Sequence, residues 1–208
     1  MKYPAIILLF IISIFSIHSQ TKIKYDSEYK NIIDSVLELN KADFANDTSG
    51  GKQVFDESLN GRFYIKMFEN GKQMEDIESI RRGIPLICKA TLSRDTDTLY
   101  IGGFWGLSVG FEFYLVLHAD SLRAYYSPVS DEEIFKLKKD GSEYFNTVNV
   151  PSSSEKLILA QVPQNEHGEY VKGYTEFKSA EFYEKTDSGI NTYRVEMKVY
   201  FSPRINKY

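Results

Sequence analysis

Cysteine is nearly absent from the 208-residue chain, which contains only Cys88. A chain with one cysteine forms no internal disulfide bond, so side-chain packing must stabilise the fold. Cys88 alternates with the apolar residues Leu86, Ala90 and Leu92, a spacing that places its thiol on the apolar face of a predicted strand. We therefore expect this thiol to be buried and unreactive.

An excess of basic residues is also missing. The chain has 25 Lys and Arg against 29 Asp and Glu, a net charge of −4. A nucleic-acid-binding protein needs a basic surface, so we expect no nucleic-acid partner. The content of 42% hydrophobic and 26% charged residues is that of an ordinary folded, water-soluble domain, and it excludes collagen-like and disordered chains.

Long hydrophobic runs are limited to one, at residues 5–17. The run follows Lys2 and leads to the small residues Ser16 and Ser19, the three-part layout of a secretory signal peptide. It is shorter than the roughly 20 residues that a membrane-spanning helix needs. We expect residues 1–19 to be removed and residues 20–208 to be exported to the periplasm or the extracellular space. No transmembrane helix is expected in the mature chain. No cysteine lies directly after the run, where a bacterial lipid anchor would be attached.

One helix is predicted near the start of the mature chain. Between residues 26 and 45 the apolar residues Ile32, Ile33, Val36 and Leu37 recur at spacings of three and four, with polar residues between them. Asp26 or Ser27 is a suitable N-cap. A helix with one apolar stripe is expected to pack against a sheet.

The apolar period changes from 3.6 to 2 after this helix, which predicts strands. The clearest strand runs from Thr192 to Phe201, and Asn70-Gly71 predicts a two-residue hairpin turn. Both faces of the strand 111–118 are mostly apolar, so we expect it to be covered on both sides. Residues 127–155 are less regular, and the acidic residues 131–133 could open a short helix.

The predicted fold is therefore mainly β, a β-rich α+β class. About eight to ten strands joined by short turns favour a single antiparallel β-sandwich or partly closed barrel, with the N-terminal helix at about 26–45 packed on it. The length and the lack of a convincing linker favour one domain over residues 20–208.

One motif associated with catalysis is present. Gly106 to Gly110 reads G-x-S-x-G, which makes Ser108 a candidate nucleophile. That motif requires a helix after the serine, whereas the residues that follow alternate like a strand. We therefore predict no catalytic residue, and keep a serine-type hydrolase using Ser108 as an alternative.

Metal and cofactor motifs are lacking. The segments 118–120 and 166–169 combine His with Asp or Glu but match no zinc spacing, and both fall at predicted turns. The chain has neither a P-loop nor a dinucleotide-binding glycine motif. We expect no metal site and no cofactor.

Aromatic residues are plentiful, with 15 Tyr and 14 Phe. Several are predicted to point away from the core: Tyr100, Phe104, Tyr114, Tyr125, Tyr170 and Tyr174. Aromatic side chains on the second face of a sheet can bind a ligand or a partner, although strand propensity also explains them. We name Trp105, Tyr114 and Tyr125 as candidate ligand-binding residues.

These patterns favour a non-enzymatic binding or interaction module for a small apolar ligand, a glycan or a protein partner. The alternatives are an outer-membrane β-barrel and the hydrolase using Ser108. A deep pocket lined by Trp105, Tyr114 and Tyr125 would favour a small molecule, whereas a filled interior with an exposed apolar patch would favour a protein.

Overall fold

The computed structural model describes residues 23–45, 59–74, 83–93, 95–106, 108–119, 121–164 and 166–207. The predicted signal peptide at residues 1–19 lies outside these ranges. The described elements, in chain order, are β1 (Ile23–Tyr25), α1 (Tyr29–Ala45), β2 (Gly61–Glu69), β3 (Lys72–Gln73), β4 (Ile84–Ser93), β5 (Thr98–Gly106), β6 (Val109–His118), β7 (Ser121–Ser130), β8 (Phe135–Lys136), β9 (Val150–Leu159), β10 (Gly173–Ser179), β11 (Phe182–Thr186), β12 (Gly189–Phe201) and β13 (Ile205–Lys207).

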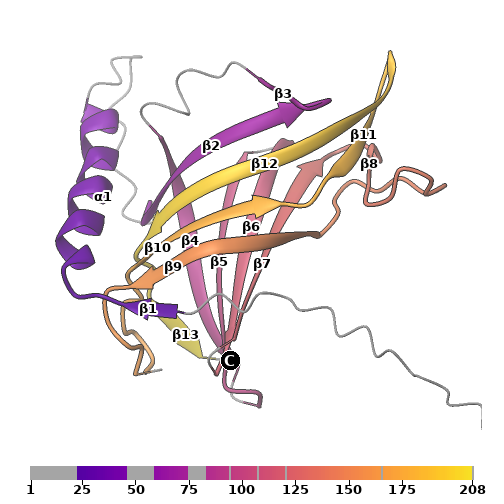
Figure 1. The fold of residues 1–208 in the computed structure, drawn as a ribbon. Coiled ribbons are helices and arrows are strands. Elements are labelled where there is room, and N and C mark those ends of the chain that lie inside the picture. The colour runs from indigo at the N-terminus through magenta and orange to yellow at the C-terminus, as the bar shows by residue number, and fades with distance from the viewer. Residues whose placement is uncertain are drawn as a thin grey trace, which may run out of the picture.

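Eight of these strands close into an antiparallel barrel (Figure 1). Strands β2, β4, β5, β6, β7, β9, β10 and β12 are neighbours in that order. Strand β12 then pairs with β2 along its length, from Tyr193 opposite Glu69 to Phe201 opposite Gly61. The predicted β-rich fold with one N-terminal helix is confirmed, and of the two predicted architectures it is the barrel.

Shorter strands extend the sheet at its ends. Strand β1 pairs in parallel with β9, β13 pairs in parallel with β4, and β11 links β12 to β8. The β2–β3 hairpin turns at Asn70 and Gly71, whose φ angles are 49° and 79°. Positive φ at both central residues is what a type I′ turn requires, so the predicted turn is confirmed.

Alternate residues of each barrel strand point inward and form the core. On β12 they are Tyr193, Val195, Met197, Val199 and Phe201, as predicted, and on β6 they are Phe111, Phe113, Leu115 and Leu117. Aromatic rings also pack inside the barrel, with the Phe111 ring centroid 4.8 Å from that of Phe63 and 5.7 Å from that of Tyr126. Packed side chains therefore occupy the interior.

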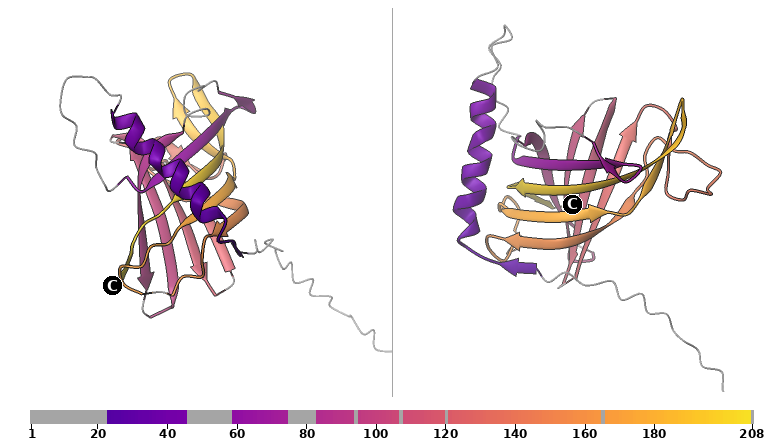
Figure 2. Two further views of the ribbon diagram at one scale, coloured as in Figure 1. Left: turned by 90° about the vertical axis from the view of Figure 1, so that its left-hand side faces the viewer. Right: turned by 45° about the horizontal axis from the view of Figure 1, so that its top comes forward.

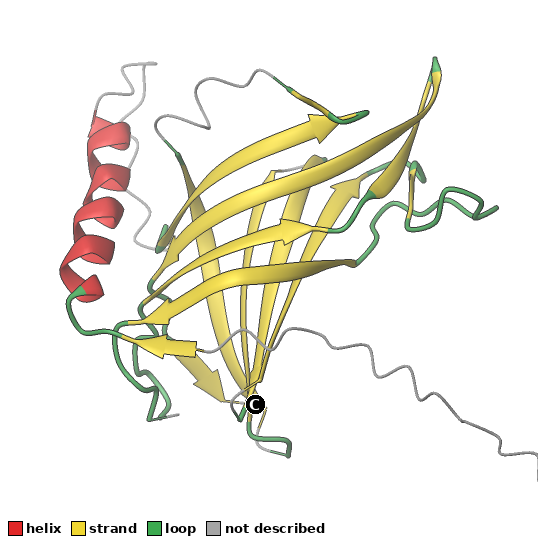
Figure 3. Cartoon of the chain, in the orientation of Figure 1, coloured by secondary structure: helices red, strands yellow, loops and turns green. Residues whose placement is uncertain are grey.

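Helix α1 packs against β10, β12 and β2, and it lies outside the barrel (Figure 2). Near its start the Asp26 carboxylate accepts a hydrogen bond from the backbone N–H of Glu28 at 3.1 Å, consistent with the predicted capping role. Ile33 is fully buried. Helix α1 is the one helix among the described residues (Figure 3), and it is not long and apolar enough to cross a membrane.

A buried polar network fixes α1 to β2. Arg62 is 1% exposed and donates hydrogen bonds of 3.0 Å to the Asn40 side-chain oxygen and to the carbonyl of Gly83. The Asn40 amide in turn donates to the carbonyls of Leu59 and Gly61, at 3.1 and 3.0 Å. Asn40 thus connects the helix, the chain before β2, and the Arg62 guanidinium.

The segment 127–155 is more regular than we predicted. Strand β7 continues to Ser130, and β9 begins at Val150 and includes the serine run 152–154. The short helix at 131–133 does not form: the Ser130 hydroxyl accepts the backbone N–H of Glu132, as a helix N-cap would, but the chain continues into β8 at Phe135. Phe135 and Phe145 also exchange backbone hydrogen bonds of 2.9 and 2.8 Å, which hold the chain in a loop.

The expectation that strand 111–118 is covered on both sides is wrong. Its outward residue Tyr114 is 36% exposed. A barrel strand has one face in the interior, and α1 lies over β10, β12 and β2 instead of β6. The apolar outward side chains of β6 therefore need another explanation.

Candidate functional site

The three predicted ligand-binding residues do not come together. Trp105 packs at the barrel mouth against two core residues, with ring centroids 5.9 Å from Phe63 and 5.8 Å from Phe111. Tyr114 and Tyr125 point to the outside of the barrel, where they are opposite each other in the β6–β7 register. Trp105 therefore belongs to the inward face of the sheet, whereas Tyr114 and Tyr125 belong to the outward face.

Tyr114 and Tyr125 instead belong to a continuous apolar surface on the outside of four adjacent strands. We call it the outer aromatic face, and its members are Ile87 of β4, Tyr100 and Phe104 of β5, Tyr114 and Val116 of β6, and Tyr125 of β7. The exposed fractions of Ile87, Tyr100, Phe104 and Tyr114 are between 36% and 43%.

The strand register makes these side chains neighbours. Ile87 is opposite Phe104, and Tyr100 is opposite Val116. Tyr114 is opposite Gly102, where an added Cβ would lie 3.2 Å from the Tyr114 ring. The ring therefore extends over the glycine, and a larger residue at position 102 would require the ring to shift by a few tenths of an ångström.

Charged residues lie around this face. Lys89 is opposite Gly102, and Arg123 is opposite Val116; both are exposed. Glu112 is opposite Phe104, and its carboxylate accepts a hydrogen bond from the Tyr114 hydroxyl. An apolar centre with charges nearby is the usual composition of a protein–protein interface.

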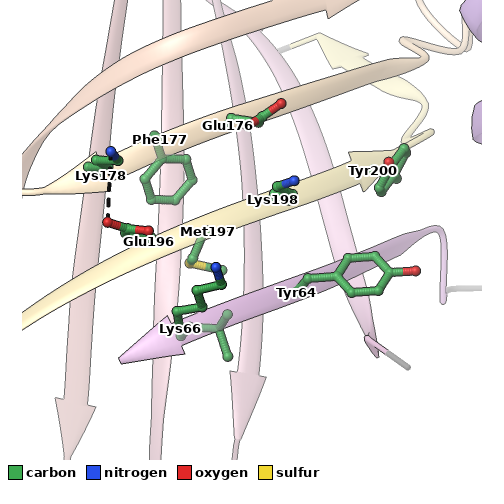
Figure 4. Close-up of a pocket in the computed structure, with 10 residues that line it drawn as sticks. Tyr64, Lys66, Glu176, Phe177, Lys178, Glu196, Met197, Lys198 and Tyr200 are labelled. Carbon is green, nitrogen blue, oxygen red and sulfur yellow. Dashed lines mark ion pairs between the residues drawn. The ribbon is translucent and has the colours of Figure 1, made fainter. Parts of the chain in front are cut away.

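A second surface feature lies on another part of the barrel, over β10, β12 and β2. It is a groove of about 480 Å³ (Figure 4). We call it the lysine–tyrosine groove. Its lining residues are Tyr64, Ile65, Lys66, Glu176, Phe177, Lys178, Glu196, Met197, Lys198 and Tyr200. Local sequence patterns do not indicate this groove, because β2 is more than 100 residues away in the sequence from β10 and β12.

Ser108 lies in the hairpin between β5 and β6. Gly106 and Gly110 are opposite each other in this hairpin, and Gly106 has a φ of 118°. An added Cβ on Gly110 would lie 2.1 Å from the carbonyl oxygen of Trp105, so the glycines permit a tight turn. A strand follows Ser108 instead of a helix, and His118 lies at the other end of that strand. The G-x-S-x-G residues thus form a hairpin here.

The histidine-containing segments have structural contacts. His118 Nδ1 lies 3.2 Å from the Thr98 hydroxyl, and the Glu169 carboxylate accepts the backbone N–H of Gln164 and the side-chain amide of Gln161. Within the described ranges no three His, Cys, Asp or Glu side chains are grouped to hold a metal ion. The expectations of no metal, no cofactor and no catalytic residue stay predictions.

Cys88 has the predicted environment. Its side chain is 3% exposed, and burial raises the pKa of its thiol. The backbone N–H of Cys88 donates to the Asn60 side chain at 2.7 Å, and the Asn60 amide donates back to its carbonyl at 2.9 Å. This cysteine is part of the core.

No family model, curated protein or solved structure matches the chain. Evidence for function therefore comes from the outer aromatic face and the lysine–tyrosine groove.

Proposed function

We propose that this chain is an exported, non-enzymatic interaction module that binds a protein partner through its outer aromatic face. The observation that carries the proposal is the exposure of four large apolar side chains, Ile87, Tyr100, Phe104 and Tyr114, on one continuous sheet surface. Isolated apolar residues are common on protein surfaces, but a contiguous patch marks an interaction site.

A protein partner fits this face better than a small apolar ligand does. Small ligands bind in concave sites that enclose most of their surface. Here the barrel interior is occupied by core side chains such as Phe113 and Phe177, whereas the outer aromatic face is the open outside of a sheet. Tyrosine and phenylalanine are enriched in protein interfaces, where they contribute much of the binding energy.

The charges around the face indicate the chemistry of the partner. Lys89 and Arg123 are exposed beside the apolar residues, while Glu112 is engaged by the Tyr114 hydroxyl. We therefore infer a partner surface with an apolar centre and acidic residues opposite Lys89 and Arg123. Such rim charges mainly set the association rate and its dependence on salt.

The outer-membrane barrel remains the second candidate, because the closed barrel has eight strands. Membrane barrels carry apolar residues outside and polar residues inside. In this chain the inward residues of β12 are apolar, while Arg194, Glu196 and Lys198 point outward. This distribution favours the interaction module over the membrane barrel. Purification of residues 20–208 without detergent would support the interaction module.

Export to the periplasm or the extracellular space, without a lipid anchor, is part of the proposal. It is supported by the signal-peptide pattern of residues 1–19. N-terminal sequencing of the protein from its source is expected to begin at Gln20. A mature protein that retains residues 5–17 would contradict this part.

The partner is tested by affinity purification of the tagged full chain from its source, which shows which proteins the chain retains. The test variant Tyr100→Ser/Tyr114→Ser removes two members of the outer aromatic face. The control variant Tyr170→Ser removes an equally exposed tyrosine elsewhere. We expect one protein to be retained by the wild type and by Tyr170→Ser, and to be lost from the double variant. Equal retention by all three would contradict the proposal.

A further inference from the structure

The lysine–tyrosine groove lies on the part of the barrel that α1 borders, away from the outer aromatic face. Seven of its lining side chains carry a charge or a hydroxyl: Tyr64, Lys66, Glu176, Lys178, Glu196, Lys198 and Tyr200 (Figure 4). Its volume of about 480 Å³ falls within the range of roughly 300–1,000 Å³ found for small-ligand sites. The groove is thus large enough for a ligand and lined mostly by polar side chains.

Positive charge exceeds negative charge around this groove. Among the side chains that the structure describes on β2, β9, β10 and β12, the outward cations here are Lys66, Lys156, Lys178, Arg194 and Lys198, and the outward carboxylates are Glu176 and Glu196. Within the part of the chain that the structure describes, Lys66 and Lys198 form no ion pair. The chain as a whole carries −4, so this surface opposes the net charge.

The two carboxylates are held by neighbouring cations. The Glu196 Oε1 atom lies 3.8 Å from Lys178 Nζ and 3.5 Å from Arg194 Nη2. The Glu176 Oε1 atom lies 3.9 Å from Lys156 Nζ. Lys66 is opposite Glu196 and Lys198 is opposite Glu176 in the strand register, but the carboxylates pair with the other cations, so the ammonium groups of Lys66 and Lys198 can contact a ligand. Both side chains are exposed.

A row of tyrosines leads from the groove toward α1. The Tyr200 ring centroid lies 6.1 Å from that of Tyr64 and 4.6 Å from that of Tyr174, which in turn lies 6.1 Å from Tyr29 of the helix. Tyrosine offers an apolar ring and a hydroxyl, a combination that suits the C–H faces and hydroxyl groups of a sugar. Packing within the row holds these rings in place.

From this arrangement we propose that the lysine–tyrosine groove binds an anionic saccharide, with Lys66 and Lys198 contacting its carboxylate or sulfate group and Tyr64 and Tyr200 contacting the sugar ring. Glu176 and Glu196 accept hydrogen bonds from sugar hydroxyls. The groove and the outer aromatic face share no residue, so the test of saccharide binding is independent of the test of the protein partner.

The experiment measures binding of two probes to the mature chain by calorimetry: a galacturonate trimer, which carries carboxylates, and a heparin tetrasaccharide, which carries sulfates. The matched neutral probe is the methyl ester of the galacturonate trimer. We expect at least one acidic probe to bind, with an affinity at least tenfold above that of the neutral ester, and to weaken with added salt. The probe that binds identifies the anionic group.

Variants assign the binding to the groove. Lys66→Gln/Lys198→Gln and Tyr64→Ala are each expected to weaken binding at least tenfold, whereas Lys89→Gln on the outer aromatic face leaves it unchanged. Urea unfolding verifies that each variant is folded. Binding of neither acidic probe, equal binding of the neutral ester, or unchanged binding by Tyr64→Ala would each overturn the proposal, the last because it would indicate charge attraction without contact to the sugar.

Discussion

Tyr114 and Tyr125 lie opposite each other across β6 and β7, and both side chains point away from the barrel interior. One residue earlier on β6 and one later on β7, Phe113 and Tyr126 are also opposite each other, and they are 0% and 2% exposed. A single residue step therefore separates the core from the outer aromatic face. The core stabilises the barrel, which leaves the outer face available for a partner.

Stability is expected to depend on Phe113 far more than on Tyr114. Phe113→Ala creates a cavity in the core, and we predict a loss of about 3–5 kcal/mol in the free energy of unfolding. Tyr114→Ala removes a cross-strand contact on the surface, for which we predict a loss of at most about 1 kcal/mol. Urea unfolding measures both. Similar losses for the two variants would contradict the assignment of inner and outer faces.

The Asn40 network is expected to contribute strongly to the attachment of α1. Asn40→Ala removes the acceptor for Arg62 and the donor for two backbone carbonyls, so we predict a loss of about 2–3 kcal/mol. The neighbouring variant Leu39→Ala, at a residue that is 45% exposed, is predicted to change the unfolding free energy by less than about 0.5 kcal/mol. If both variants unfold at the same urea concentration, the network does not stabilise the helix.

Alkaline pH is expected to destabilise the protein. Burial raises the pKa of Tyr193 to about 12 and raises the pKa values of Cys88, Tyr126 and Tyr200. The unfolded chain loses these protons at its ordinary pKa values, so their contribution is complete at neutral pH and is lost as pH rises above about 9. Each group adds a slope of up to about 1.4 kcal/mol per pH unit. The measurement is urea unfolding at increasing pH.

A matched variant tests the cause of this slope. Tyr126→Phe keeps the buried ring but removes the ionisable hydroxyl, so we predict a shallower loss of stability above about pH 10. An unfolding free energy that rises with pH in this range would mean that folding lowers the pKa values of these groups, which is incompatible with their burial in the neutral form.

Thiol reactivity distinguishes Cys88 from position 108. We predict that a thiol reagent modifies Cys88 only after unfolding, because its side chain is buried and its pKa is raised. In a Ser108→Cys variant the added thiol lies in an exposed hairpin and is expected to react in the folded state. Rapid modification of the wild-type protein at neutral pH would be incompatible with the core position of Cys88.

The sequence predicted the features that depend on local patterns. Alternation from Tyr193 to Phe201 identified the inward face of β12, and Asn70-Gly71 identified a turn that needs two positive φ angles. Alternation shows which side chains share a face of one strand. It does not show what covers that face, and for this reason the exposure of Tyr114 was not predicted.

The candidate site depended on long-range register. Trp105 and Tyr114 are separated onto different faces because the β5–β6 hairpin pairs Gly106 with Gly110. The two glycines are a signal for this tight hairpin, although their spacing around Ser108 also matches the hydrolase motif. Lys66 and Lys198 meet in one groove only because β12 pairs with β2 to close the barrel.

Site-specific photo-crosslinking tests the outer aromatic face most directly. Benzoylphenylalanine is introduced at Tyr100 or Tyr114 and, as controls, at Tyr25 or Tyr170, which are exposed outside both proposed sites, and each full chain is irradiated in its source. We predict an adduct of one defined mass from positions 100 and 114 and none from positions 25 and 170. Adducts from all four positions, or from the control positions alone, would contradict a partner bound at this face.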